Sequence, residues 1–326
     1  MRLLDRVAQC RTPFVVENRS TGRRTRLTGA ADSAELVAGC PLRYVLSDEL
    51  THLCAALAYS EGARTLECAD LLHVPAERTW LEWCEAPWCA ELLLHGFPLR
   101  HEQIAQTGRR GALLLASPDG RRGSMRTFWS VGPSDSDVEA SPMFAEFDLD
   151  AAGDGGERDV LARCFRFRLD RAWDDYYRDS GLVENARGAI HRHYLGVTAI
   201  DVPLVLSFLL LLAARSTLVH RPQHAHRLNR SRLGKGQPPL LDHIEVRAPF
   251  LPDYPGSEGG AGQGARRSPR LHHVRGHIVR RGNQLFWRIP HLRGTARAGQ
   301  VLSRTVTWTF DRASTRRAVA ERASLV

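Results

Sequence analysis

The chain of 326 residues is long enough to form one large hydrophobic core or two modest ones. Its 43% hydrophobic and 25% charged residues are typical of a globular protein and exclude wholesale disorder. The formal net charge is +9, and it is unevenly placed. Residues 1–220 hold 25 basic and 30 acidic side chains, whereas residues 221–326 hold 20 basic and 6 acidic ones. This asymmetry predicts an acidic partner for the C-terminal third, most simply nucleic acid, and not a membrane surface.

The choice of basic residue has a separate explanation. Lys235 is the only lysine, so 44 of the 45 basic residues are arginine. This ratio is typical of a GC-rich genome, which accounts for the use of arginine but not for its concentration after residue 220.

Cysteines and apolar runs indicate the compartment. The seven cysteines are odd in number, lie between residues 10 and 164 and sit in apolar contexts, which predicts buried free thiols in a reducing cytoplasm. The N-terminus lacks the apolar segment of a signal peptide. The longest apolar run, Val202–Ala214, is shorter than the roughly 20 residues that span a bilayer, so we expect a buried core helix.

The first 150 residues alternate in the manner of an antiparallel sheet, with one strong helical pattern. The helix is expected from Ser47 to Gly62, where a serine cap, early acids and a final glycine frame the apolar spacing. In chain order the predicted strands are a hairpin at 13–28, a strand at 78–86, a hairpin at 111–131 that turns at Asp119-Gly120, and a strand at 143–150.

The second half is expected to be helical at first and then basic and extended. Residues 157–220 are predicted helical, with the helix from about Val202 to Val219 passing through the core. A strand is expected at 243–247 and a flexible Gly/Pro/Ser linker at Pro252–Ser268. The last predicted strands are Leu271–Arg281, Leu285–Pro290 and Ser303–Phe310.

Together these patterns predict an α+β fold: a mostly antiparallel sheet, a buried central helix and a small basic β-rich C-terminal region. The expected organisation is an α+β domain at 1–220, a basic connector at 221–251, the linker at 252–268, a basic β region at 269–310 and a tail at 311–326.

The segment "SPRLHHVRGHIVRR", residues 268–281, carries the main functional signal. On one continuous strand His273, Arg275, His277 and Arg281 would share a face. We expect no metal there, because Arg275 stands between the two histidines, which would be roughly 13 Å apart. No Asp or Glu occurs from Gly259 to Phe310 to complete a ligand set. No metal and no cofactor is indicated.

Phosphate chemistry fits the same residues. Arginine binds phosphate oxygens bidentately and neutral histidine transfers protons near pH 7, so a metal-independent ribonuclease would use His273 and His277, with His291 as a substitute. Plain nucleic-acid binding needs less, since ten arginines lie in the 52 residues of 259–310. The third interpretation is that the segment is only a solvent-exposed, arginine-rich sheet face. The residues predicted to bind nucleic acid are Arg270, Arg275, Arg280, Arg281, Arg288, Arg293 and, by stacking on a base, Trp287.

Several stretches resemble a known group of sequences. "LNRSRLGKGQPPLLDHIEV" (228–246) and "SPRLHHVRGHIVRR", followed by "LFWRIPHLRG" and "SRTVTWTF", resemble a family of uncharacterised phage, prophage and plasmid proteins, as does "ADLLHVPAERTWLEW" (69–83). The family has no established activity, so the resemblance implies a mobile-element origin and a bacterial cytoplasmic setting but no catalytic residue.

The sequence therefore predicts a phage or prophage protein that binds DNA or RNA through an Arg/His-rich C-terminal β surface. The alternatives are the ribonuclease and a virion or assembly protein. Other phage or host proteins are further expected partners, a membrane is not, and the location is the bacterial cytoplasm or the virion.

Overall fold

The computed structural model describes residues 1–17, 22–60, 68–94, 108–130, 138–153, 163–179, 184–214, 218–248, 270–274, 277–282, 284–288, 291–293 and 295–300. The chain forms two compact units. Unit 1 comprises residues 1–210 and 220–247, and unit 2 comprises residues 211–219 and 248–326. The predicted linker at 252–268, the strand at 303–310 and the tail at 311–326 lie outside the described residues.

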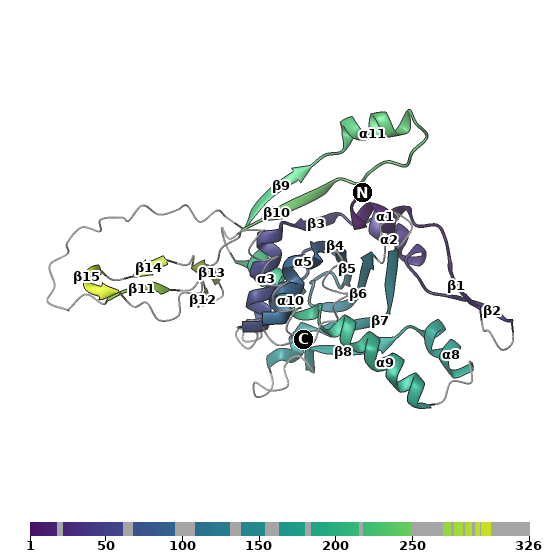
Figure 1. Ribbon diagram of the computed structural model, residues 1–326, viewed down its shortest axis with the longest axis horizontal. Helices are drawn as coiled ribbons and strands as arrows, with labels where there is room; N and C mark the ends of the chain where they lie inside the picture. Colours follow the sequence, from purple (N-terminus) through teal and green to yellow (C-terminus); the bar gives the residue numbers. More distant parts are fainter. Residues whose placement is uncertain are drawn as a thin grey trace, which may run out of the picture. The chain divides into compact units, whose positions relative to one another are not determined.

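The described elements confirm an α+β fold (Figure 1). The helices are α1 (Leu3–Gln9), α2 (Ala34–Ala38), α3 (Asp48–Ser60), α5 (Glu85–Leu94), α8 (Arg171–Asp179), α9 (Glu184–Ala199), α10 (Val202–Ala213) and α11 (His226–Leu233), with 3-10 turns η1 (Ala31–Ser33), η2 (Ala69–Leu71) and η3 (Leu149–Gly153). The strands of unit 1 are β1 (Phe14–Glu17), β2 (Arg24–Leu27), β3 (Leu42–Leu46), β4 (Arg78–Cys84), β5 (Arg109–Ala116), β6 (Arg122–Ser130), β7 (Val138–Asp148), β8 (Phe165–Leu169), β9 (Val219–Gln223) and β10 (His243–Arg247).

One large sheet organises unit 1, in the order β8-β7-β6-β5-β4-β3-β10-β9. The pairs from β8 to β4 are antiparallel, whereas β3 pairs in parallel with both β4 and β10. Strands β1 and β2 form the separate hairpin that was expected at 13–28. The sheet is thus mostly antiparallel, as the alternating patterns predicted, with a mixed edge.

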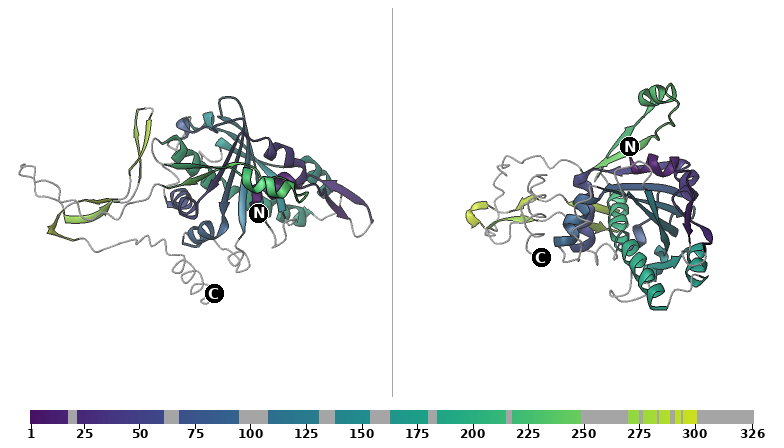
Figure 2. Two further views of the ribbon diagram at one scale, coloured as in Figure 1. Left: turned by 90° about the horizontal axis from the view of Figure 1, so that it is seen from above. Right: turned by 45° about the vertical axis from the view of Figure 1, so that its right-hand side comes forward.

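The central strands are apolar on both faces, because helices cover both. On one face Trp80 and Phe128 pack with Leu3 and Val7 of α1. On the other face Leu114 of β5 lies beside α10, and Figure 2 shows α3, α5 and α10 grouped there. Adjacent residues of a strand point to opposite faces, so the run "ALLLA" in β5 contributes to both cores.

Helix α10 is the buried central helix that the apolar run predicted. Its buried side chains are Val202, Leu204, Val205, Leu206, Phe208, Leu209, Leu210 and Leu211. The helical stretch Gly188–Ala213 has the length and composition to cross a membrane, but 61% of its most apolar window is buried inside the protein. This burial is that of a core helix.

Two expectations for residues 157–220 are wrong. Residues 165–169 are strand β8, not helix, because Phe165, Phe167 and Leu169 alternate with Arg166 and Arg168 at a period of two. The core helix ends at Ala213 rather than Val219, and Val219 begins strand β9.

Residues 221–251, expected to be a connector, contribute two strands and a helix to the structure. Strand β10 inserts beside β3, with Val246 opposite Leu46, and β9 forms the sheet edge. Helix α11 lies between them in the chain.

Glycines allow two close approaches around the predicted hairpin. Gly120 has φ of +72° at its turn, and a Cβ there would lie 2.2 Å from the Val74 carbonyl oxygen. A Cβ on Gly111 would lie 2.5 Å from Trp80 Cζ2, so the indole packs directly on the β5 backbone.

The cysteines are free thiols, as expected. Cys40, Cys54, Cys68, Cys89 and Cys164 are buried, whereas Cys10 and Cys84 are half-buried. Burial raises the pKa of the Cys40 thiol to about 11, so this group is an unreactive thiol at neutral pH.

Candidate nucleic-acid interface

A basic arm projects from the sheet edge of unit 1. We define the basic arm as residues 219–243, which leave the sheet on β9, form α11 and return to β10 (Figure 1). It contains five basic residues (Arg221, Arg227, Arg230, Arg232 and Lys235) against the single acid Asp242. No residue of α11 is buried.

The arm is anchored to helix α1 at its base. The Leu241 N–H donates to Asp5 Oδ1 at 2.8 Å, and the Gln9 side-chain amide donates to the Pro239 carbonyl at 3.0 Å. Asp5 is buried, and this burial raises the pKa of its carboxyl. The contacts hold the returning segment against the body of unit 1.

Side chains of α11 bind the returning segment. Asn229 donates to the Leu240 carbonyl at 2.9 Å and accepts from the Leu240 N–H at 2.7 Å, so it forms a pair like that between two strands. Arg232 Nε donates to the Pro238 carbonyl at 2.9 Å. The turn between them uses Gly236, whose φ is +67°. These bonds fix the helix although it has no apolar core.

The inner and outer faces of α11 differ in charge. Asn229 and Arg232, three residues apart, mark the inner face. At about 100° per residue, Arg227, Arg230 and Ser231 fall on the opposite, outer face. Arg227 and Arg230 are exposed and make no ion pair with any residue that the structure describes. The outer face is therefore a pair of unneutralised guanidinium groups on a fixed helix.

The structure describes some of the C-terminal arginines that were predicted to bind nucleic acid. Strands β12 (His277–Arg281) and β13 (Gln284–Arg288) form an antiparallel hairpin on which Arg280, Arg281 and Arg288 are exposed. The Arg281 guanidinium lies over the Phe286 ring, 5.9 Å from its centroid. Arg280 Nε donates to the Gly282 carbonyl at 3.1 Å. These three side chains are exposed to solvent.

The expectation of one continuous strand from Leu271 to Arg281 is wrong. Strand β11 (Arg270–Val274) pairs with β14 (His291–Arg293) and β15 (Thr295–Gln300), whereas β12 pairs with β13 in a different sheet. Strand β12 pairs with β13, which follows it directly after the turn at Gly282 (φ of +58°), whereas β11 pairs with strands later in the chain.

The three histidines predicted to act together have different pairing positions. His273 is opposite Leu292 and His291 is opposite Val274, both in the sheet of β11. His277 is opposite Arg288 in the other sheet. Arg270 and Arg293 belong to β11 and β14, and Trp287 belongs to β13 opposite Ile278. Arg275 lies outside the described residues.

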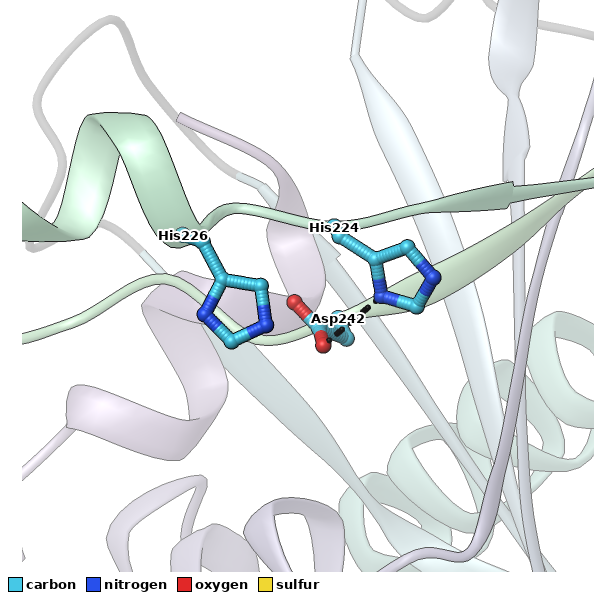
Figure 3. A group of neighbouring side chains, drawn as sticks. All are labelled: His224, His226 and Asp242. Atoms are coloured by element: carbon cyan, nitrogen blue, oxygen red, sulfur yellow. Dashed lines mark hydrogen bonds and ion pairs between the residues drawn. The ribbon is translucent and has the colours of Figure 1, made fainter.

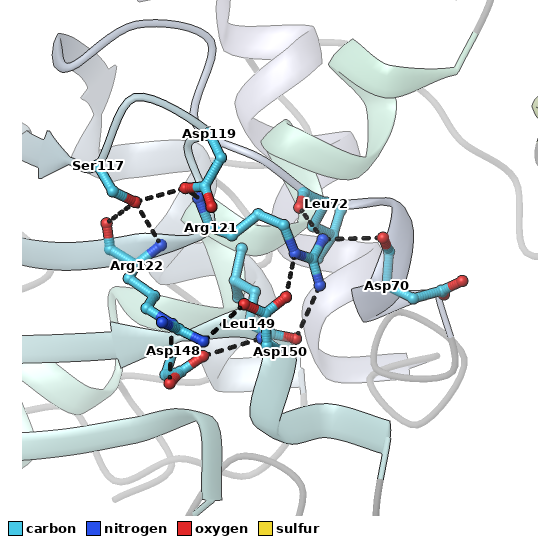
Figure 4. Close-up of polar contacts among 9 residues, drawn as sticks. All are labelled: Asp70, Leu72, Ser117, Asp119, Arg121, Arg122, Asp148, Leu149 and Asp150. Atoms are coloured by element: carbon cyan, nitrogen blue, oxygen red, sulfur yellow. Dashed lines mark hydrogen bonds and ion pairs between the residues drawn. The ribbon is translucent and has the colours of Figure 1, made fainter.

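Carboxylates near residue 150 pair with two arginines of the β5–β6 turn (Figure 4). Arg122 pairs with Asp148 at 3.2 Å and with Asp150 at 3.1 Å, and Arg121 also pairs with Asp150. The Arg121 guanidinium donates further to the carbonyls of Asp70, Leu72 and Leu149. The cluster joins η2 and η3 to the β5–β6 turn, and its role is structural.

A buried ionic cluster lies at the opposite end of β5 from the β5–β6 turn. Arg110 donates to Asp201 Oδ2 at 2.8 Å and to Glu85 Oε1 at 3.4 Å, and its guanidinium lies 4.7 Å from the Trp88 ring centroid. Burial raises the pKa of Asp201 to about 6 and raises that of Glu85, while Arg110 opposes both shifts. Perturbed groups of this kind occur in active sites. Here Asp201 is fully buried, and the cluster ties β5 to α5 and to the start of α10.

A second buried pair joins α3 to α5 and has a pH dependence. His52 Nε2 lies 3.1 Å from Glu91 Oε1. Burial raises the pKa of Glu91 to about 7 and lowers that of His52, so burial favours the neutral form of each group. Ionisation of Glu91 therefore lowers the free energy of unfolding.

The pair gives a prediction for stability against pH. The pKa of Glu91 is higher in the folded state than its ordinary value of 4.5, so its favourable contribution is complete below pH 4.5 and is lost as pH rises toward 7. We expect Glu91→Gln to be stabilised relative to wild type at pH 8 by on the order of 1–3 kcal/mol, and to gain little at pH 4. Urea denaturation at both pH values measures this difference. Glu35→Gln, at an exposed position, is the control, and an equal gain at both pH values would contradict the interpretation.

The sequence reasoning missed both the arm and the buried clusters. The signal for the arm was present as "HRLNRSRLGKGQPPL", a basic helical segment followed by a Gly/Pro turn. No local signal marks Arg110, since only folding brings it to Asp201.

In comparisons with known proteins, no family model, curated sequence or solved structure matches the chain.

Proposed function

We propose that this protein binds nucleic acid through the basic arm, with the outer face of α11 as the principal contact. The observation that carries the proposal is the exposed pair Arg227 and Arg230, which no described carboxylate neutralises. Arginine binds phosphate oxygens bidentately, and a fixed helix loses little conformational entropy when it does so.

The shape of the arm favours duplex DNA. A helix of eight residues is about 12 Å long, and the major groove of B-DNA is about 12 Å wide. The major groove of A-form RNA is too deep and narrow for side chains to reach its bases. The arm therefore fits B-DNA better than duplex RNA.

The C-terminal arginines supply a second contact in this proposal. Arg280, Arg281 and Arg288 are exposed on the β12–β13 hairpin, and Arg270, Arg275, Arg293 and Trp287 complete the set expected from sequence. The resemblance to phage and prophage proteins supports a role on phage or host DNA in the bacterial cytoplasm.

A protein partner is less well supported by the same arm. Leu228 and Leu233 are 61% and 62% exposed, which is the pattern of a protein-binding helix only when such residues share a face. Five positions along a helix place them about 140° apart, at the two borders of the inner face. The ribonuclease alternative gains no support either, because His277 belongs to a different sheet from His273 and His291.

The test is the double variant Arg227→Ala/Arg230→Ala. We expect its affinity for a fluorescein-labelled 20-base-pair duplex to fall about tenfold or more at low salt, because two phosphate contacts are lost. The slope of log affinity against log salt should decrease in magnitude by about 2. Fluorescence anisotropy over a range of KCl concentrations measures both quantities, and a duplex RNA of equal length tests the preference for duplex DNA.

The matched control removes two arginines from another exposed helix. Arg171→Ala/Arg178→Ala on α8 makes the same change in net charge and should leave DNA affinity within about twofold of wild type. Equal losses in the two double variants would mean that net charge, and not the arm, determines binding. A wild-type chain that retains no nucleic acid at low salt would falsify the proposed function.

A further inference from the structure

Three side chains with metal-binding atoms meet at the base of the basic arm (Figure 3). His224 follows β9, His226 is the first residue of α11, and Asp242 is the residue before β10. One ligand atom from each lies within 4.8 Å of those from the other two. His224 Nδ1 is already 3.1 Å from Asp242 Oδ2.

Backbone contacts orient this group before any ligand binds. The Ala225 N–H donates to Asp242 Oδ1 at 2.9 Å, which leaves Oδ2 directed toward His224. The Arg43 guanidinium donates to the Asp242 carbonyl at 3.2 Å, and the Asn229–Leu240 pair holds the two segments together on the other side. The two imidazole rings lie 6.1 Å apart with planes inclined by 30°.

We propose that His224, His226 and Asp242 form a site for a divalent transition-metal ion such as Zn²⁺ or Co²⁺. Two imidazole nitrogens and one carboxylate oxygen are donors that suit these ions, whereas Mg²⁺ and Ca²⁺ prefer oxygen ligands. The three residues supply three ligands and leave a fourth position open to solvent, which is the arrangement of a reactive rather than a purely structural zinc site.

The geometry needs only small side-chain movements. Metal–ligand bonds of about 2.0–2.2 Å place the ligand atoms of a tetrahedral site about 3.4 Å apart. The His224–Asp242 pair already satisfies this spacing, and the His226 ring must approach by about 1.5 Å. All three residues are exposed, so the rotation meets no packing. Arg227 next to the site reduces the affinity for a cation.

The histidines for which the sequence indicates no metal are His273 and His277 of the C-terminal region, where no carboxylate is close in sequence. Here His224 and Asp242 are 18 residues apart, and the arm brings them together. The proposed site is independent of nucleic-acid binding, since the metal contacts none of the residues on the outer face of α11.

The experiment titrates the metal-free full chain with CoCl₂ and follows visible absorption, and then displaces Co²⁺ with ZnCl₂. We expect one equivalent to bind with the intense spectrum of four- or five-coordinate Co²⁺ and to be displaced by Zn²⁺. His226→Gln is the primary variant, because the loss of the imidazole leaves the Ala225–Asp242 bond in place. It should weaken binding at least about tenfold. Asp242→Asn should do the same.

His220→Gln is the matched control, an exposed histidine on β9 outside the group. Its Co²⁺ affinity and spectrum should equal those of wild type. Absence of saturable binding at one equivalent, or equal affinity in wild type and both ligand variants, would overturn the proposal. An octahedral Co²⁺ spectrum that persists in His226→Gln would show that only the His224–Asp242 pair binds, and would overturn the three-residue site. DNA affinity is measured separately, so its failure leaves this result unaffected.

Discussion

Replacing Arg110 with methionine is expected to lower the free energy of unfolding by about 3–5 kcal/mol at pH 8. The Arg110 guanidinium is the cation between Glu85 and Asp201, and all three residues are buried. Its removal leaves two carboxylates in the interior without a counter-charge, and the cost of an uncompensated buried charge exceeds the value of the ion pair itself. Urea denaturation followed by circular dichroism measures the loss.

Two further measurements identify the cause as charge. Burial already raises the pKa of Asp201 to about 6, so lowering the pH lets its carboxyl become neutral. The destabilisation of Arg110→Met should therefore be smaller at pH 5 than at pH 8. Adding Glu85→Gln and Asp201→Asn to Arg110→Met should recover most of the loss. A loss that is the same at both pH values and is not recovered would instead indicate lost packing against Trp88 and Trp129.

Replacing Glu82 with alanine is expected to have the second largest effect, about 3–4 kcal/mol. Glu82 is fully buried on β4 and accepts hydrogen bonds from the first N–H groups of α1, those of Leu3 at 3.2 Å and Leu4 at 2.8 Å. It also pairs with Arg109. A carboxylate at a helix N-terminus satisfies donors that the helix itself cannot, and these donors are buried. Removing it leaves two N–H groups without an acceptor.

The location of the damage tests this prediction as well as its size. Helix α1 should lose protection from hydrogen exchange before the sheet does, because Glu82 is what binds its first turn to β4. Glu77→Ala, an exposed glutamate just before the same strand, is the control and should change stability by less than about 0.5 kcal/mol. Unchanged protection of α1 in Glu82→Ala would contradict the role assigned to the carboxylate.

The arginines of this chain have two different environments, which composition cannot separate. Arg126 is buried, donates to the Ser141 carbonyl at 2.9 Å and to the Thr28 carbonyl at 3.1 Å, and so joins β6 to the end of β2. Burial lowers its pKa to about 10. Arg227 and Arg230 are exposed and point away from the structure that holds their helix. Both kinds add equally to the net charge of +9, but only the second kind can bind a polyanion.

Local patterns in the sequence were sufficient for the elements that short-range physics determines. The β5–β6 hairpin was predicted because Asp119-Gly120 suits a tight turn, and the Ser117 and Asp119 side chains do hydrogen-bond to the turn. Helix α3 was predicted from its cap, and the Leu50 N–H does donate to Ser47 Oγ at 3.3 Å. The apolar run of α10 predicted burial, since a helix without a polar face can only lie in a core.

The tertiary structure decided the rest, because the deciding contacts join residues that are distant in the chain. Strand β10 lies beside β3 although about 200 residues separate them, and no local pattern states which strand will be its neighbour. The segment 271–281 was expected as one strand because its residue types allow it, but its halves pair with different partners. His224, His226 and Asp242 meet only because β9 and β10 run to and from the same helix. Sequence by itself determined the alternation, the caps and the excess of basic residues after residue 220. The pairing of distant strands decided which of those residues stand together in space.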